Sequence, residues 1–225
     1  MVKTIRLLGM EIENYSLREE LMHVEAFYEK NELSIIRTMT MKQLALAVED
    51  QSVRDGISMA DMVVMGDKEI LSEAGIQSAQ RLREASEHVF MQELLKRIYR
   101  NRCKVFLAVE HLGQEPLLRD FLTEKHGELQ IVGAYAAEEC NGEPDILFNE
   151  VNASAADTVL SVICSPLEEM FLVDAKAKLA ANIWYSLGEW QSFAKSRSVL
   201  YEKCRKLIHK GKFKNVVHSY EQGNE

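Results

Sequence analysis

The sequence predicts an α/β fold in which a mostly parallel β-sheet is flanked by helices. Three observations lead to this prediction. Short apolar and β-branched segments alternate with amphipathic helical patterns along the chain. The 225 residues include only 11 glycines and 3 prolines, so tight turns are few and helix is favoured. Hydrophobic residues make up 47% and charged residues 28% of the chain, which is typical of a globular domain and excludes extensive disorder.

The predicted strands are short runs rich in apolar and β-branched residues. In chain order they are Thr4–Leu8, Leu33–Thr38, Asp61–Met65, Lys104–Val109, Leu129–Val132, Asp157–Ile163 and Asn182–Tyr185. Helical patterns separate them, which predicts βα units. We expect the strands from Leu33–Thr38 to Asp157–Ile163 to lie in one mostly parallel sheet, because successive βα units place their strands side by side.

Helix signals lie between these runs. The clearest is at Ser16 and Glu19, which form a capping box followed by an apolar stripe of Leu17, Leu21, Val24 and Tyr28. A longer helical region is predicted from Ser78 to Asn101. Another helix is predicted from Gly113 to Lys125, immediately before the strand at Leu129.

The charge is distributed unevenly. The chain carries 27 basic and 35 acidic residues, a net charge of -8, which argues against nonspecific binding to nucleic acid. The segment from Lys195 to Lys214 nevertheless contains eight basic residues and one acid, Glu202. Between Ser196 and Lys210 an apolar stripe lies among these cations, which predicts a basic amphipathic helix. Three roles fit such a helix: it lies on an anionic membrane, it neutralises a diphosphate, or it docks on the rest of the chain, which is acidic.

The chain therefore divides into an α/β domain, residues 1–193, and a basic C-terminal helix and tail, residues 194–225. Its four cysteines lie far apart without a CxxC pair, and its six histidines form no HExxH motif, so no metal site is expected. Neither a GxGxxG nor a P-loop motif is present, and no cofactor is predicted. We expect a cytoplasmic protein, because the N-terminus lacks a signal-peptide pattern and no run of about 20 apolar residues occurs.

Ligands of open parallel sheets bind beyond the carboxyl ends of the strands, so the residues that follow each predicted strand are candidates. Ser165, Pro166, Glu168 and Glu169 follow the most apolar strand. Ser165 suits an N-cap, Pro166 the first helical position and Glu168 the third. The segment is then a helix start with a purely structural role, or its N-terminus faces a phosphate or a sugar hydroxyl. The adjacent glutamates favour a hydroxyl.

Three further side chains follow strands. Asp67, after Gly66, is either a general base toward an acceptor hydroxyl or a helix cap. Thr38 and Thr40 either offer hydroxyls to a ligand or cap the helix that contains Leu44.

Other polar and aromatic residues have simpler interpretations. His111 has no adjacent nucleophile, so we interpret it as a solvated or hydrogen-bonded loop residue. Trp184, Tyr185 and Trp190 form a local aromatic group, for which core packing is favoured over a stacking platform.

Several segments, taken in order, resemble a known family. They are Leu7–Ile12 followed by the Ser16 helix, Ala60–Val64, Lys104–Ala108, Leu129–Tyr135, Val151–Asp157, and Ser165-Pro166 with Glu169. From about Ile5 to Phe193 the chain resembles the WecG/TagA/CpsF glycosyltransferases. The resemblance implies a Rossmann-like domain that transfers an N-acetylhexosamine-type sugar from a UDP-sugar to a lipid-diphosphate-linked acceptor during bacterial surface polysaccharide synthesis.

The resemblance also implies roles for individual residues. Thr38, Thr40, Ser165, Glu168 and Glu169 would line the substrate site. Arg197, Lys203, Arg205 and Lys206 would contact the acceptor or the inner face of the membrane, and a homo-oligomer is compatible with the family. The family's proposed base is an Asp before a Gly, whereas this chain has Gly66-Asp67. Asp67 is the catalytic candidate if its loop is displaced by one residue. The alternative is a catalytically inactive relative that binds a nucleotide-sugar or acts as a regulatory or scaffold partner.

Overall fold

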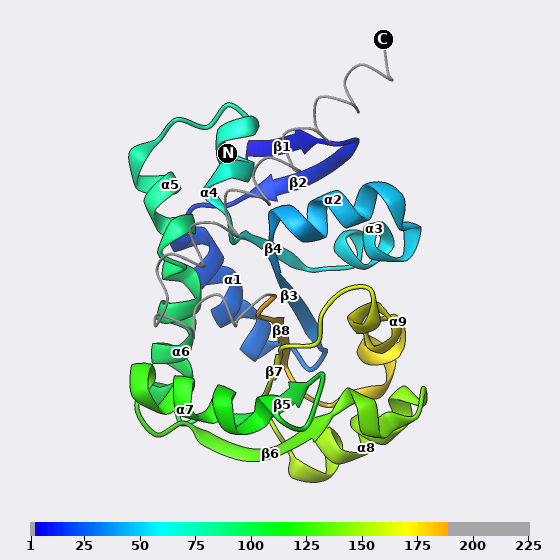
Figure 1. Ribbon diagram of the computed structural model, residues 1–225. Helices are drawn as coiled ribbons and strands as arrows, with labels where there is room; N and C mark the ends of the chain where they lie inside the picture. The colour runs from blue at the N-terminus through cyan, green and yellow to red at the C-terminus, as the bar shows by residue number, and fades with distance from the viewer. Residues whose placement is uncertain (1–2, 189–225) are drawn as a thin grey trace.

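A computed structural model describes residues 3–188 of the chain (Figure 1). The predicted basic helix, with Arg197, Lys203, Arg205 and Lys206, lies outside the described residues, and so does Trp190.

The main sheet has six parallel strands in the order β4-β3-β8-β7-β5-β6. The strands are β3 (Ser34–Met39), β4 (Met62–Met65), β5 (Lys104–Val109), β6 (Gln130–Ala136), β7 (Thr158–Ser161) and β8 (Ile183–Ser186). The prediction of a single parallel sheet is confirmed. Each strand lies within a few residues of its predicted bounds.

The first predicted strand does not join this sheet. Residues Lys3–Leu7 form β1, which pairs antiparallel with β2 (Met10–Asn14) in a separate two-stranded sheet. The expectation of a βα unit at Thr4–Leu8 was therefore wrong. Leu8 and Gly9 both have positive φ angles, 52° and 71°, and form a two-residue hairpin turn that reverses the chain.

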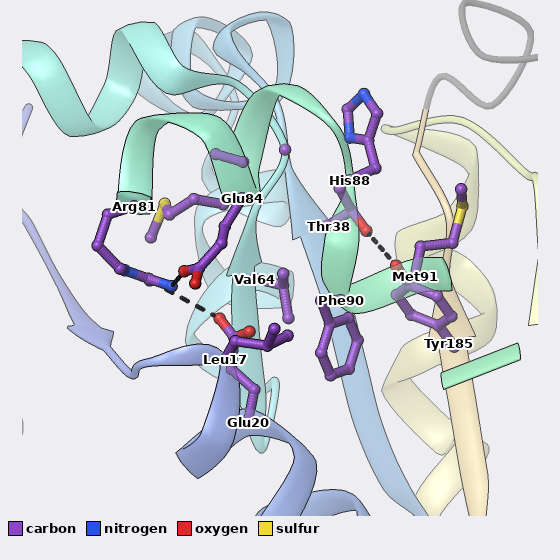
Figure 2. Close-up of a pocket in the computed structure, with 13 residues that line it drawn as sticks. Leu17, Glu20, Thr38, Val64, Arg81, Glu84, His88, Phe90, Met91 and Tyr185 are labelled. Atoms are coloured by element: carbon purple, nitrogen blue, oxygen red, sulfur yellow. Dashed lines mark hydrogen bonds and ion pairs between the residues drawn. The ribbon is translucent and has the colours of Figure 1, made fainter. Parts of the chain in front are cut away.

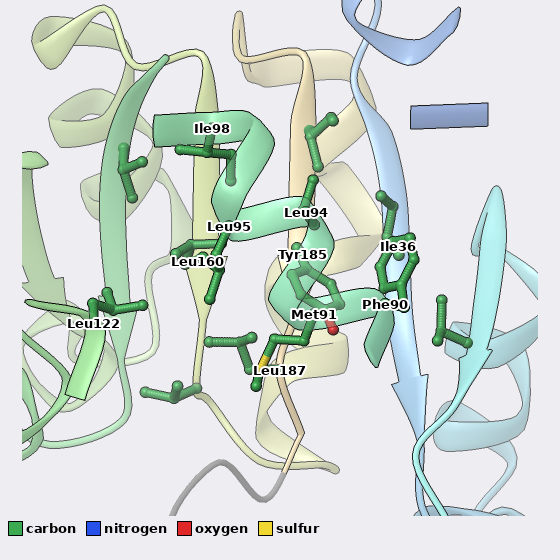
Figure 3. Packing of buried hydrophobic residues seen from close by; sticks show 14 of the residues in the cluster. Ile36, Phe90, Met91, Leu94, Leu95, Ile98, Leu122, Leu160, Tyr185 and Leu187 are labelled. Carbon is green, nitrogen blue, oxygen red and sulfur yellow. The ribbon is translucent and has the colours of Figure 1, made fainter. Parts of the chain in front are cut away.

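Helices cover both faces of the main sheet (Figure 1). One face is covered by α1 (Leu17–Glu29), α6 (Val89–Asn101) and α7 (Gln114–His126). Figure 3 shows the apolar side of α6, from Phe90 to Ile98, packed over β3, β7 and β8. The other face is covered by α8 (Pro144–Ser154) and α9 (Leu167–Lys178), and a short 3-10 helix, η1 (Ala137–Cys140), follows β6.

A third apolar cluster joins the hairpin to the β4 side of the sheet. It includes residues of α2 (Met41–Glu49), α3 (Gln51–Ser58), α4 (Lys68–Glu73) and α5 (Ala79–Ser86). The region predicted to be helical from Ser78 to Asn101 is helical, but it is divided into α5 and α6, because the helix is interrupted at His88, whose φ is 51°. The break lets Ala85 pack in this third cluster while Phe90 packs against the sheet.

The connections between strands place a crevice at the carboxyl edge of the sheet. From β3 the chain passes through α2 and α3 to β4 on one side, and from β5 it passes through α7 to β6 on the other side. The loops after β3 and β5 thus diverge above β8 and β7. Such a switch point is where open α/β sheets bind ligands.

Candidate functional site

The switch-point crevice is lined by residues of α2 and of the segments that follow β3, β7 and β8. They are Thr40, Lys42, Gln43, Leu46, Cys164, Ser165 and Gly188. Thr40 caps α2, since its hydroxyl accepts from the Gln43 N–H at 3.2 Å. The cap interpretation of Thr40 is confirmed, and the same residue faces the crevice.

A buried arginine lies beneath this crevice. The Arg37 side chain, on β3, is 1% exposed. Its Nη2 donates to Glu169 Oε1 at 2.8 Å, to Ser165 Oγ at 3.0 Å and to Glu168 Oε2 at 3.4 Å. Three polar atoms of this network, Arg37 Nε, Arg37 Nη1 and Glu169 Oε2, are buried without a hydrogen-bond partner among the described residues. The network therefore joins three of the predicted site residues to one that the sequence analysis missed.

Glu168 does not face the crevice. Its Oε1 accepts from Ser161 Oγ at 2.6 Å, Ser186 Oγ at 2.7 Å and Trp184 Nε1 at 3.1 Å, and the residue is fully buried. Its carboxylate thus ties α9 to β7 and β8. Core packing of Trp184, the favoured interpretation, is confirmed.

The predicted N-cap at Ser165 was wrong. Helix α9 begins at Leu167 with Pro166 at the N-cap position, and no side chain caps it. The Ser165 hydroxyl is instead hydrogen-bonded to Arg37 and Glu169. The carboxylates of Glu168 and Glu169 are both directed at Arg37 on the sheet.

A signal for Arg37 was present in the sequence. It is the one charged residue inside the predicted strand Leu33–Thr38, and a buried arginine is stabilised by carboxylate partners. The adjacent pair Glu168 and Glu169 supplies them, about 130 residues further along the chain. A buried charge on a central strand could have been matched to these two acids.

Gly56 of α3 allows this network to pack. A Cβ atom at residue 56 would lie 2.8 Å from Arg37 Nη1 and 2.9 Å from Glu169 Cγ. We expect Gly56→Ala to lower the free energy of unfolding by about 1–3 kcal/mol, although alanine favours helix, because overpacking displaces buried side chains. Urea denaturation checks this. Gly113→Ala is the control, since a Cβ there has no atom within 4 Å. Equal stability of the two variants would contradict the prediction.

Thr38 faces the opposite side of the sheet from Arg37. Its Oγ1 is 2.9 Å from the hydroxyl of Tyr185, and both residues are buried. Thr38 therefore lies outside the switch-point crevice. It lines a small cavity under α5 and α6, together with Glu20 and Arg81 (Figure 2).

Asp67 follows β4 and lies close to the crevice. Its Oδ2 accepts from the Met41 N–H at 2.8 Å, and Met41 directly follows the crevice residue Thr40. Asp67 occupies the N-cap position of α4 without a side-chain cap bond. It lines a cavity of about 180 Å³ with Met41, Gly66, Lys68, Glu69, Ser86 and His88. The structure thus places Asp67 beside Thr40 but in a different cavity from Ser165.

Gly66 restricts where a carboxylate can stand in this loop. A Cβ at residue 66 would lie 2.6 Å from Thr38 Cγ2 and 3.0 Å from the Met39 carbonyl oxygen. Any side chain there would collide with a buried residue and with backbone. A carboxylate in this loop is therefore accommodated at residue 67 and not at residue 66.

Glu20 is a buried acid that lines the small cavity of Figure 2. Arg81 is shared between Glu84, at 2.8 Å, and Glu20, at 3.9 Å. Burial raises the pKa of Glu20 from its usual 4.5 to about 7, and the charge of Arg81 opposes this only in part. The protonated carboxyl is therefore favoured in the folded protein.

We expect the contribution of Glu20 to the free energy of unfolding to fall as the pH rises from about 4.5 to about 7, because the folded state holds the Glu20 proton more tightly than the unfolded chain. Glu20→Gln mimics the protonated form. The stability of the variant relative to the wild type should rise by about 2–3 kcal/mol between pH 5 and pH 8 in chemical denaturation. Glu29→Gln, an exposed glutamate at the end of the same helix, is the control. A constant difference between Glu20→Gln and wild type at both pH values would contradict the assignment.

The remaining candidates have structural roles. His111 is 59% exposed, and its Nδ1 lies 2.9 Å from Glu138 Oε2, a hydrogen bond that raises the pKa of His111. Its interpretation as a hydrogen-bonded loop residue is confirmed. Within residues 3–188 no group of three His, Cys, Asp or Glu side chains is placed to hold a metal ion. No helix in the same range is long and apolar enough to cross a membrane.

The six-stranded parallel sheet and its switch-point crevice define a Rossmann-like α/β protein. The family model described as the WecG/TagA/CpsF family of glycosyl transferases matches residues 5–195, and the chain belongs to this family. No curated protein matches the chain. Family membership confirms the resemblance and supports a glycosyltransferase-like role in cell-surface polysaccharide synthesis.

Proposed function

We propose that the chain binds a UDP-linked N-acetylhexosamine in the switch-point crevice and transfers the sugar to a hydroxyl of a lipid-diphosphate-linked acceptor. Family membership supports the reaction class. The observation that carries the proposal is the position of Asp67. Its carboxylate is fixed by the Met41 N–H at 2.8 Å, next to the crevice, and opens onto a cavity of about 180 Å³.

The proposed reaction is a single displacement at the anomeric carbon of the donor sugar. The acceptor oxygen forms the new glycosidic bond, the bond from the anomeric carbon to the diphosphate breaks, and UDP leaves with the electron pair. The acceptor proton passes to Asp67. A carboxylate held by a backbone N–H is oriented before the substrate arrives, which favours this role.

The basic segment from Lys195 to Lys214 supports the acceptor part of the proposal. Its eight cations suit a diphosphate or an anionic lipid surface. We therefore propose that the protein works at the inner face of the membrane, where Arg197, Lys203, Arg205 and Lys206 contact the acceptor.

A second candidate function is an inactive relative that binds a nucleotide-sugar and regulates or supports an active transferase. One observation favours it. The resemblance assigns the family's base to the position of Gly66, and the close contacts of Gly66 with Thr38 and Met39 leave no room for a side chain there.

Titration calorimetry of the full chain with UDP and UDP-N-acetylhexosamines tests both candidates. Binding followed by donor hydrolysis or sugar transfer supports the transferase. Binding without turnover supports the inactive relative. If no uridine nucleotide binds, both candidates are wrong.

A further inference from the structure

Ser165 is the member of the Arg37 network that also lines the switch-point crevice. Its Oγ accepts from Arg37 Nη2 at 3.0 Å and donates to Glu169 Oε1 at 2.9 Å. The direction of both hydrogen bonds is fixed by their partners, because a guanidinium group can only donate and a carboxylate accepts. A hydroxyl has one proton and two lone pairs. The network therefore uses the Ser165 proton and one lone pair, and leaves one lone pair for a ligand.

We infer that Ser165 acts in the crevice as an obligate hydrogen-bond acceptor and selects an N–H or O–H group of the ligand. The inference rests on the proposed function for the identity of that ligand, a nucleotide-sugar. A phosphate oxygen offers only lone pairs at neutral pH, so it finds no donor at Ser165. The N3–H of uracil and the hydroxyl or amide N–H of the sugar both fit.

The directions of the two hydrogen bonds of the Ser165 hydroxyl are fixed because its partners are buried. The side chains of Arg37 and Glu169 are 1% and 5% exposed. The other oxygen of Glu169 already lacks a hydrogen-bond partner among the described residues. Turning the Ser165 proton toward a ligand would remove one of the two donors of the buried Glu169 Oε1 and leave Arg37 Nη2 as the other, which costs free energy. A Cβ at residue 56 would lie within 3.0 Å of both side chains, so the two are packed closely against α3.

The first test compares the wild type with Ser165→Ala by titration calorimetry against UDP, N3-methyl-UDP, a UDP-N-acetylhexosamine and pyrophosphate. The variant should bind about 3- to 10-fold more weakly any ligand whose N–H or O–H group donates a hydrogen bond to Ser165, which is the range for one hydrogen bond. If the uracil N3–H donates the hydrogen bond, Ser165→Ala weakens the binding of UDP but not of N3-methyl-UDP. If a group of the sugar donates it, Ser165→Ala weakens the binding of the UDP-sugar but not of UDP. Either result supports the inference.

Two results would overturn the inference while wild-type binding shows that the proposed function holds. Weaker binding of pyrophosphate to Ser165→Ala would show that the hydroxyl donates to phosphate. Unchanged binding of every ligand would show that Ser165 does not contact one. Ser154→Ala is the matched control, because the Ser154 hydroxyl donates to the Val151 carbonyl within α8.

A second test needs no ligand. Melting temperatures of Ser165→Ala, Glu169→Gln and the double variant report whether Ser165 donates to Glu169. Because the two side chains are hydrogen-bonded, the loss in the double variant should be smaller than the sum of the single losses. Additive losses would overturn the inference. If no uridine nucleotide binds the wild type, the proposed function fails, and this test alone decides the hydrogen-bond assignment.

Discussion

Asp67→Asn is expected to lower the rate of sugar transfer by about 10²–10⁴-fold while leaving the affinity for the UDP-sugar nearly unchanged. Asparagine keeps the shape of the side chain, and its carbonyl oxygen can still accept from the Met41 N–H, which lies 2.8 Å from Asp67 Oδ2. The amide cannot take the acceptor proton. Single-turnover transfer assays and titration calorimetry measure the two effects separately.

Asp61→Asn provides a matched control for this prediction. Asp61 also accepts a backbone N–H from the neighbouring chain segment, that of Ile35 at 2.8 Å. Asp61 precedes β4 and Asp67 follows β4, so the two residues lie at opposite ends of this strand. Turnover that survives Asp67→Asn, or falls equally in Asp61→Asn, would show that another group is the base.

Arg37→Met is expected to lower the free energy of unfolding by about 3–5 kcal/mol, because it leaves the buried Glu168 and Glu169 without their cation. The melting temperature should fall by roughly 6–20 °C, given about 2–4 °C per kcal/mol for a domain of this size. Chemical and thermal denaturation at neutral pH measure the loss.

Two further variants separate the buried charge from other effects of the Arg37 substitution. Arg37→Met combined with Glu169→Met removes both partners of the closest ion pair and should recover much of the stability. Arg83→Met removes an arginine that is 74% exposed and paired with Glu87 at 3.8 Å, so it should cost less than about 1 kcal/mol. A loss for Arg37→Met as small as that for Arg83→Met would contradict the assigned role.

The sequence predicted the sheet because each strand is a local pattern. Buried parallel strands are continuous apolar runs in the sequence, and the helices between them show apolar residues at the 3.6-residue spacing of a helix. The hairpin at Leu8 was missed because a leucine with positive φ leaves no signal in the sequence. The interruption between α5 and α6 at His88 was missed for the same reason. It depends on tertiary packing, because Ala85 packs in the cluster beneath the hairpin and Phe90 packs against the main sheet.

The site was predicted in part. The rule for strand ends identified Thr40, Ser165 and Asp67, which the structure places at the carboxyl edge of the sheet. It could not predict the direction of the glutamates, because one residue of difference in a helix start rotates every side chain by about 100°. Arg37 was missed because its partners are close in space and distant in sequence.

The β1–β2 hairpin also has a consequence for the solubility of the protein. Within residues 3–188, β4 is paired on one side by β3, and β2 lies next to it without pairing. An uncovered edge strand offers free backbone groups on which other chains can add as further strands. The hairpin covers this edge, and Ile5, Leu7 and Ile12 anchor it in the apolar cluster that also contains Met65 of β4. The hairpin formed by residues 3–14 thus protects the β4 edge of the sheet from intermolecular aggregation.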